Sequence, residues 1–339
     1  MGRNTPSGSG LIPKIFWLTA LITGFFTLAA AGPVPAQEEI TAESFVVMDA
    51  QTGKILLSCN PQLMLPPAST IKIMTASYVL DHLKMDDKVR VSAYAAAAPP
   101  SKINIKEGEV YTVRELLYAL LLSSANDGAR ALAERVSGTE ECFAYSVTQQ
   151  MRKWGAYRTT VATANGLPHS NQYSSAEDLA LIFRRAAQNP EFANIVKTKE
   201  YEIQGNRELR NHDRFLFTTP LARGGKTGYT RASKHTYVGM FQNHDKAIII
   251  SIMGSKKKWA DLRQLIEKGF AISGKPIPPL EPVEERLVFA KNHMGNSVGA
   301  GEPSRAGKSK WCRPKASASK VSMGSVVASP AARKKVRKK

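Results

Sequence analysis

Apolar positions between residues 44 and 271 follow two periodicities, and each predicts a different kind of element. Apolar residues that alternate with polar ones, or run together over a few positions, predict strands. The segments with this pattern are 44–48, 54–57, 236–241 and 247–253. Turn-forming residues separate the first two and predict a hairpin, and the polar segment 242–245 joins the last two.

Helical periodicity predicts helices between these strands. Pro66 and Pro67 suit a helix start, so a helix is expected from there to Leu83. Residues 113–135 predict two helices separated by the turn-forming segment 123–128. Further helices are predicted at 176–187 and 259–271. The expected fold is therefore α/β (α+β): an antiparallel sheet flanked by helices, with an inserted helical region.

The first 36 residues have the composition of an export signal peptide. Arg3 and Lys14 precede an apolar run at 15–31, and small residues at 34–36 offer a cleavage site before Gln37. Residues 29–31 are a second candidate cleavage site, and an uncleaved anchor is the alternative, although the run is short for a membrane span. Either way, the body of the protein is expected in the periplasm or another extracytoplasmic space, with membrane association left open.

Residues 276–339 are predicted to lie outside the folded domain. Four prolines between Pro276 and Pro282 mark a linker, and a short helix could form at 281–291. The remainder is rich in Ser, Ala, Gly and Lys, which predicts disorder. We therefore expect a signal peptide at 1–36, one folded domain large enough for an enzyme at 37–275, and a Pro-rich linker with a basic tail at 276–339.

The formal net charge of +19 would suit a nucleic-acid partner if it formed a basic face on the domain. Its distribution argues against this, because no Asp or Glu follows Arg305, while residues 333–339 are cationic except for Val336. Much of the basic charge thus belongs to the tail, and no nucleic-acid partner is expected. The tail could contact anionic membrane lipids or wall polymers, or it could simply be solvated.

The cysteine and glycine patterns predict neither a metal nor a cofactor. Cys59, Cys142 and Cys312 are too few for a disulfide-rich framework, and their odd number leaves at least one unpaired within the chain. We interpret them as core or incidental thiols. No Cys/His cluster has zinc-site spacing, and no Gly-rich loop has the pattern of a nucleotide-binding site.

Three short motifs occur in an order that suits nucleophilic catalysis: Ser69-Thr70-Ile71-Lys72, Ser124-Ala125-Asn126 and Lys226-Thr227-Gly228. Residues three apart on a helix share a face, so Lys72 can reach the Ser69 hydroxyl. A serine hydroxyl needs a neighbouring base, and lysine, with a pKa of about 10.4, must be shifted to become one. Burial and a second cation, such as Lys226, would lower that pKa. Other Ser-x-x-Lys pairs, at Ser255 and Ser317, are not followed by the other two motifs.

In these motifs the chain resembles the penicillin-binding proteins, and specifically the D-alanyl-D-alanine carboxypeptidases. The resemblance extends from about Ile40 to Ala271 and includes further segments that match the family pattern. They are 52–56, 66–72, 108–117, 124–127, 165–168, 173–176 and 224–230. It implies a β-lactamase/transpeptidase-like fold, peptidoglycan stem peptides as substrates and β-lactam antibiotics as inhibitors.

The resemblance also implies a role for each matched residue. Ser69 would be the nucleophile, Lys72 its base, and Ser124 the relay of a proton to the leaving D-alanine. Asn126 would hold the substrate amide. Lys226 and Thr227 would bind the terminal carboxylate. The backbone N–H of Tyr229, which follows Gly228, would join that of Ser69 in the oxyanion hole, and these residues complete the substrate-binding set.

The chain departs from the family pattern at Arg231-Ala232-Ser233-Lys234-His235, where small residues are usual, so the rim of the cleft could differ in charge. A second, β-rich domain and an amphipathic C-terminal helix are not recognisable. His169, His212 and His235 do not lie in a nucleophile elbow and are interpreted as surface or cleft residues.

Three other functions stay open at this point. A DD-endopeptidase that cleaves cross-links would use the same residues. A class A β-lactamase would need a separate glutamate, for which Glu177 lies in a comparable region but within the carboxypeptidase pattern. A non-catalytic envelope-binding protein would not need the complete set of motifs.

Overall fold

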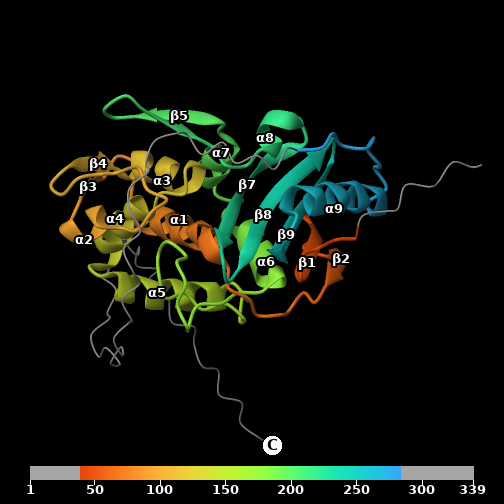
Figure 1. Cartoon of the computed structure of the whole chain (residues 1–339), viewed down its shortest axis with the longest axis horizontal. Coiled ribbons are helices and arrows are strands. Elements are labelled where there is room, and N and C mark those ends of the chain that lie inside the picture. Colours follow the sequence, from red (N-terminus) through yellow and green to blue (C-terminus); the bar gives the residue numbers. More distant parts are fainter. Residues whose placement is uncertain (1–38, 284–339) are drawn as a thin grey trace, which may run out of the picture. The chain divides into compact units, whose positions relative to one another are not determined.

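The computed structural model of the chain describes residues 39–283. A five-stranded antiparallel sheet crosses this part of the chain in the order β2-β1-β9-β8-β7 (Figure 1). The strands are β1 (Ser44–Asp49), β2 (Ile55–Cys59), β7 (Ala222–Thr230), β8 (Lys234–Asn243) and β9 (Lys246–Ser255). Val46 of β1 lies opposite Ser251 of β9, so the two ends of the domain meet in one sheet, which confirms the predicted topology.

Helices fill the chain between β2 and β7 and follow β9 (Figure 1). They are the 3₁₀ turn η1 (Ala68–Thr70), α1 (Ile71–His82), α2 (Ala93–Ala96), α3 (Val113–Leu122), α4 (Asn126–Ser137), α5 (Glu140–Lys153), α6 (Ala176–Ala186), α7 (Pro190–Lys197), α8 (Phe215–Thr218) and α9 (Lys258–Ile272). Two small hairpins lie among them, β3 (Lys88–Arg90) with β4 (Val110–Thr112), and β5 (Glu200–Ile203) with β6 (Arg207–Arg210). The predicted helical insertion is thus confirmed.

The sheet separates two hydrophobic cores because successive strand residues point to opposite faces. Val46 and Met48 of β1 belong to a core shared with α1, α3 and α6. Phe45 and Val47, one position away, belong to a second core under α9. A central sheet that is apolar on both faces explains why β1 and β9 appear in the sequence as continuous apolar runs.

The structure differs from the sequence predictions at three places. The helix predicted to begin at Pro66-Pro67 starts instead with the η1 turn, in which Ala68 has a φ of 50°. Strand β7, which carries Lys226-Thr227-Gly228, was not predicted, because glycines interrupt its pattern. Cys59 is a free, exposed thiol, in agreement with the interpretation as an incidental thiol, but Cys142 is disulfide-bonded, so that interpretation is wrong there.

The described residues begin two positions after the predicted start of the domain at 37 and continue past its predicted end at 275. Beyond residue 275, Ile277, Leu280 and Val283 still pack against the core under α9, and the Leu280 N–H donates to Glu267 Oε1 at 2.8 Å. The predicted signal peptide and most of the basic tail lie outside the described residues. Between residues 39 and 283, no helix has both the length and the apolar content needed to cross a membrane.

Candidate active site

Ser69 and Lys72 meet at the junction between η1 and α1. Ser69 lies in the 3₁₀ turn and Lys72 in the first turn of α1, which brings Lys72 Nζ to 3.0 Å from Ser69 Oγ. The same ammonium group donates to Asn126 Oδ1 at 2.8 Å and to the Asn165 carbonyl at 2.6 Å. Lys72 is fully buried. Three acceptors therefore fix the lysine head against the serine hydroxyl.

The environment of Lys72 favours its neutral form. Burial, and then the positive charge of Lys226, hold the pKa of Lys72 well below its usual value. The carboxylates of Asp127 and Glu140 act in the opposite direction. Both causes predicted from the sequence, burial and the second lysine, are thus present. A neutral amine at this distance can accept the Ser69 proton.

Ser124 and Asn126 lie where α3 gives way to α4. Ser124 has a left-handed φ of 59°, and the bend that it makes lets Asn126 begin α4 with its side chain against Lys72. The Asn126 Nδ2 group donates to the carbonyls of Pro99 at 3.2 Å and Pro100 at 2.6 Å. Both the oxygen and the nitrogen of the Asn126 side-chain amide, which is expected to bind substrate, are therefore hydrogen-bonded within the protein.

The Lys226-Thr227-Gly228 segment forms the part of β7 that packs against the serine. A Cβ at Gly228 would lie 2.9 Å from the Ser69 backbone nitrogen, so only glycine lets the two segments approach this closely. Thr236 on β8 supports the contact, since its hydroxyl donates to the Pro67 carbonyl at 2.9 Å. The edge strand β7 and the η1 turn that carries Ser69 are therefore held in close contact.

Lys226 is buried, and its Nζ donates to the Thr227 carbonyl at 2.8 Å. Burial, and then the charge of Lys258, lower the pKa of Lys226 to about 7, while the Asp213 carboxyl opposes the shift. Asp213 is itself buried and accepts a hydrogen bond from the Tyr237 hydroxyl at 2.9 Å. Lys226 is therefore poised to change charge near neutral pH.

Tyr229 lies at the exposed end of this segment, and 61% of its surface is accessible. Its ring centroid is 4.7 Å from that of His235 on β8. The basic rim predicted next to it is partly neutralised, because Lys234 forms an ion pair with Glu43 at 2.5 Å. Hydrogen bonds between Thr230 and Ser233 shape the turn between them.

Sequence reasoning missed four residues around the site. Asn165 lies in a segment matched to the family pattern, but its contact with Lys72 is through the backbone carbonyl, which any residue type could supply. Asp127, Glu140 and Asp213 are buried carboxyl groups that act on the two lysines. Of these, Asp127 could have been found from the sequence, because it directly follows Asn126 of the second motif. Among residues 39–283, no group of three His, Cys, Asp or Glu could hold a metal ion.

Comparison with known proteins agrees with this geometry. A model of the family described as D-alanyl-D-alanine carboxypeptidase matches residues 31–257. The D-alanyl-D-alanine carboxypeptidase DacB2 of Mycobacterium tuberculosis is 34% identical over 254 residues, which make up 72% of this chain and 87% of the relative.

Two solved structures have the same fold. A D-alanyl-D-alanine carboxypeptidase of M. tuberculosis superposes with a TM-score of 0.66 at 32% identity, over 75% of this chain and 97% of that one. Penicillin binding protein 5 from Haemophilus influenzae gives a TM-score of 0.64 at 28% identity, over 69% and 72% of the two chains. The chain therefore belongs to the D-alanyl-D-alanine carboxypeptidase family.

Proposed function

We propose that this protein is a serine-type D-alanyl-D-alanine carboxypeptidase that removes the terminal D-alanine from peptidoglycan pentapeptides and is inhibited by β-lactams. The observation that carries the proposal is the buried Lys72 side chain, whose Nζ lies 3.0 Å from the Ser69 hydroxyl and contacts two further acceptors. A buried lysine without such a use is costly, because its charge must be desolvated. The family's name gives the reaction class.

Each matched residue then has a step in the reaction. Ser69 Oγ attacks the carbonyl carbon between the two D-alanines, and the serine proton passes to Lys72. The backbone N–H groups of Ser69 and Tyr229 stabilise the negative oxygen that forms. Ser124 relays this proton from Lys72 to the departing D-alanine nitrogen, the C–N bond breaks, and an ester to Ser69 remains.

Substrate binding and the second half of the reaction use the remaining residues. The charged Lys226 and the hydroxyl of Thr227 bind the terminal carboxylate of the peptide, and Asn126 orients its amide. Gly228 keeps this strand close enough to the serine for both ends of the substrate to be held at once. A water molecule then attacks the ester and releases the shortened peptide.

The direct test is the variant Ser69→Ala. Fluorescent penicillin should acylate the wild-type protein at Ser69, and the variant should lose both this labelling and the release of D-alanine. Purified muropeptides separate the reactions, because a carboxypeptidase frees D-alanine whereas an endopeptidase cleaves cross-links. Retained D-alanine release in the variant, or cleavage of cross-links alone, would contradict the proposal.

We further propose that the chain is exported and that its basic tail binds an anionic surface. This rests on the apolar run at 15–31 and on residues 333–339, which are cationic except for Val336. Each basic residue close to a membrane contributes about 1 kcal/mol of attraction. Deleting all residues after Gly301 should lower the fraction bound to membrane or wall at unchanged turnover of a soluble peptide. Identical fractionation of the two forms would contradict this.

A further inference from the structure

A loop at residues 99–105 is tied to the Ser124–Asp127 region by one backbone–backbone hydrogen bond and several between side chains and backbone groups. The Asn126 N–H donates to the Ser101 carbonyl at 2.8 Å, and the Ser101 hydroxyl donates to the Ser124 carbonyl at 3.2 Å. Ser101 and Asn104 both have left-handed φ values, 67° and 58°. The loop has no regular structure of its own, so these ties decide where it lies.

Asp127 provides the central tie. Its side chain is fully buried, and its two oxygens accept from the N–H groups of Ile103 and Ile105, each at 3.2 Å. Oδ1 also accepts from the Gly128 N–H at 2.9 Å. No ion pair to Asp127 occurs within residues 39–283, so backbone N–H groups satisfy this buried carboxylate.

The opposite end of the loop sets the orientation of the Asn126 side chain. The carbonyls of Pro99 and Pro100 can only accept hydrogen bonds, so the NH₂ end of Asn126 must face them. The amide oxygen must then face Lys72, which is the arrangement that holds the lysine against Ser69. If the loop moved away, the Asn126 amide could rotate and present its donors to the lysine.

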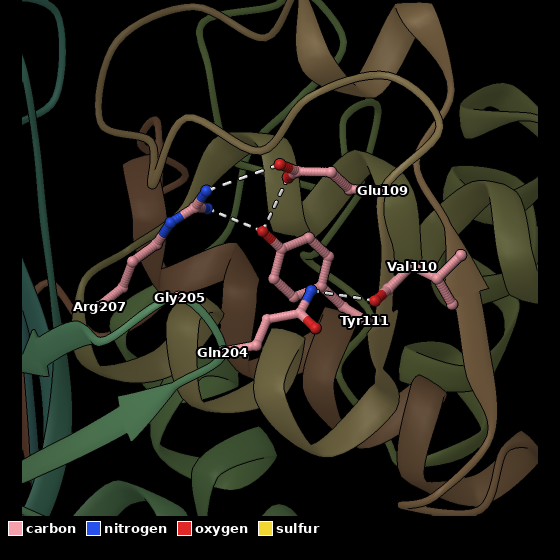
Figure 2. A pocket seen from close by; sticks show the side chains of 6 residues that line it. All are labelled: Glu109, Val110, Tyr111, Gln204, Gly205 and Arg207. Atoms are coloured by element: carbon pink, nitrogen blue, oxygen red, sulfur yellow. Dashed lines mark hydrogen bonds and ion pairs between the residues drawn. The ribbon is translucent and has the colours of Figure 1, made fainter.

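The outer side of the loop is tied by Arg207 of the β5–β6 hairpin. This arginine lies in a surface pocket of about 280 Å³. Figure 2 shows the residues that line it: Glu109, Val110, Tyr111, Gln204, Gly205 and Arg207. Arg207 Nη1 donates to the Tyr111 hydroxyl at 2.8 Å and, at 3.4 Å, to the Ile103 carbonyl. This contact to the loop is longer than those made by Asp127, so it should contribute less.

We propose that Asp127 is a positioning residue for acylation, which holds the 99–105 loop so that Asn126 keeps its amide oxygen on Lys72. Asp127 touches neither Ser69 nor the substrate in this scheme. Its charge also opposes the lowering of the pKa of Lys72. The positioning effect is separate and runs through Ile103 and Ile105 to Pro99 and Pro100, and through them to Asn126. This inference rests on the proposed function, since it concerns the rate at which Ser69 is acylated.

The test compares Asp127→Asn with a matched control, Asp178→Asn. Asp178 is also a buried carboxyl in the first turn of a helix, and it accepts from the Arg158 N–H at 2.7 Å, but it contacts another part of the chain. In Asp127→Asn, an NH₂ group would face a backbone N–H. We expect at least a tenfold lower rate constant for acylation by penicillin, a smaller change in its non-covalent affinity, and faster hydrogen exchange at Ile103 and Ile105.

The control distinguishes positioning from general destabilisation. Asp178→Asn should lower the melting temperature by a similar amount and leave the acylation rate within twofold of wild type. An Asp127→Asn protein that is acylated at the wild-type rate would overturn the inference. An equal decrease in the acylation rate constant of both variants would overturn it as well. If penicillin did not acylate even the wild-type protein, the proposed function would be overturned instead.

A second variant decides the case if Asp127→Asn does not fold. Arg207→Gln removes the outer tie at a partly exposed position, and it should lower the acylation rate two- to fivefold and speed exchange in the loop. Gln204→Ala is its control, because Gln204 lines the same pocket and its side chain donates to the Val110 carbonyl, not to the loop or to Arg207. If Arg207→Gln is acylated as fast as wild type, the loop does not govern Asn126 and the inference fails.

Discussion

Two buried lysines lie in the same site, and burial changes the acid–base behaviour of each. An ammonium group loses its hydration on burial, which favours the neutral amine and lowers the pKa. Lys72 keeps three acceptors and lies against Ser69, whereas Lys226 has one hydrogen-bond partner among residues 39–283, the Thr227 carbonyl. In the proposed mechanism Lys72 must be neutral to take a proton, and Lys226 must be charged to bind a carboxylate. The two roles therefore need opposite charge states at one pH.

The pKa of Lys226 gives a pH prediction. Because this pKa is lowered to about 7, first by burial and then by Lys258, Lys226 loses its charge as the pH rises through that value. The KM for a peptide with a free carboxylate should therefore rise above pH 7. Lys258→Gln removes the neighbouring charge, so the pKa of Lys226 should rise and this increase in KM should begin at a higher pH.

The matched control is Lys256→Gln, which removes an exposed charge two residues away that does not act on Lys226. The measurement is the pH dependence of KM from D-alanine release in all three proteins. The assignment of Lys226 to carboxylate binding would be contradicted if the rise in KM began at the same pH in Lys258→Gln as in wild type. It would also be contradicted if both variants shifted that pH equally.

At the scale of elements, the site depends on how closely β7 fits against its neighbours. A Cβ on Gly224 would lie 2.2 Å from the Val196 carbonyl at the end of α7, and one on Gly225 would lie 2.5 Å from the Tyr237 hydroxyl. A Cβ on Gly228 would meet the Thr236 hydroxyl at 2.4 Å as well as the η1 turn. Glycine residues thus let β7 lie between α7, β8 and η1.

This fit predicts the effect of Gly228→Ala. The φ of Gly228 is not in the left-handed region, so the added methyl group causes a steric conflict and little backbone strain. It should push β7 away from Ser69 and lower the rate constant for penicillin acylation at least tenfold, while circular dichroism shows a retained fold.

Gly138→Ala is the comparison, since a Cβ there would meet nothing within 4 Å, although its φ is 83°. That variant should lose about 1 kcal/mol of stability from the left-handed conformation and keep its acylation rate. A Gly228→Ala protein acylated as fast as the Gly138→Ala protein would show that the close approach is not needed.

At the scale of the whole described region, the site lies where the helical insertion meets the edge strand β7. Ser69 comes from η1, Asn126 from α4 and Lys226 from β7, and the two cores on either side of the sheet hold these elements in place. The chain beyond α9 also belongs to this packing, because residues 276–283 return to the core under that helix.

The position of the domain boundary can be tested by truncation. A protein ending at Val283 keeps the contacts of Ile277 and Leu280 and the hydrogen bond to Glu267, whereas one ending at Lys275 loses them. Since these side chains are only partly buried, the shorter form should lose about 1–3 kcal/mol of unfolding free energy. Urea unfolding measures the difference, and coincident curves would place the boundary at 275.

The motifs and the main elements could be predicted from the sequence because they depend on local information. The helices at 176–187 and 259–271 and the strands at 236–241 and 247–253 agree with α6, α9, β8 and β9 to within a few residues. Ser69 and Lys72 are three residues apart, so helix geometry alone brings them together.

Only the tertiary structure decided the rest, because it depends on contacts between distant segments. Strand β7 has too few apolar side chains for a strand pattern, and its glycines make sense only beside α7, Tyr237 and Ser69. The bonds from Asp127 to Ile103 and Ile105 join the start of a helix to an irregular loop through backbone N–H groups, which every residue type except proline carries. The sequence by itself determined which residues could react, and packing determined how they are held.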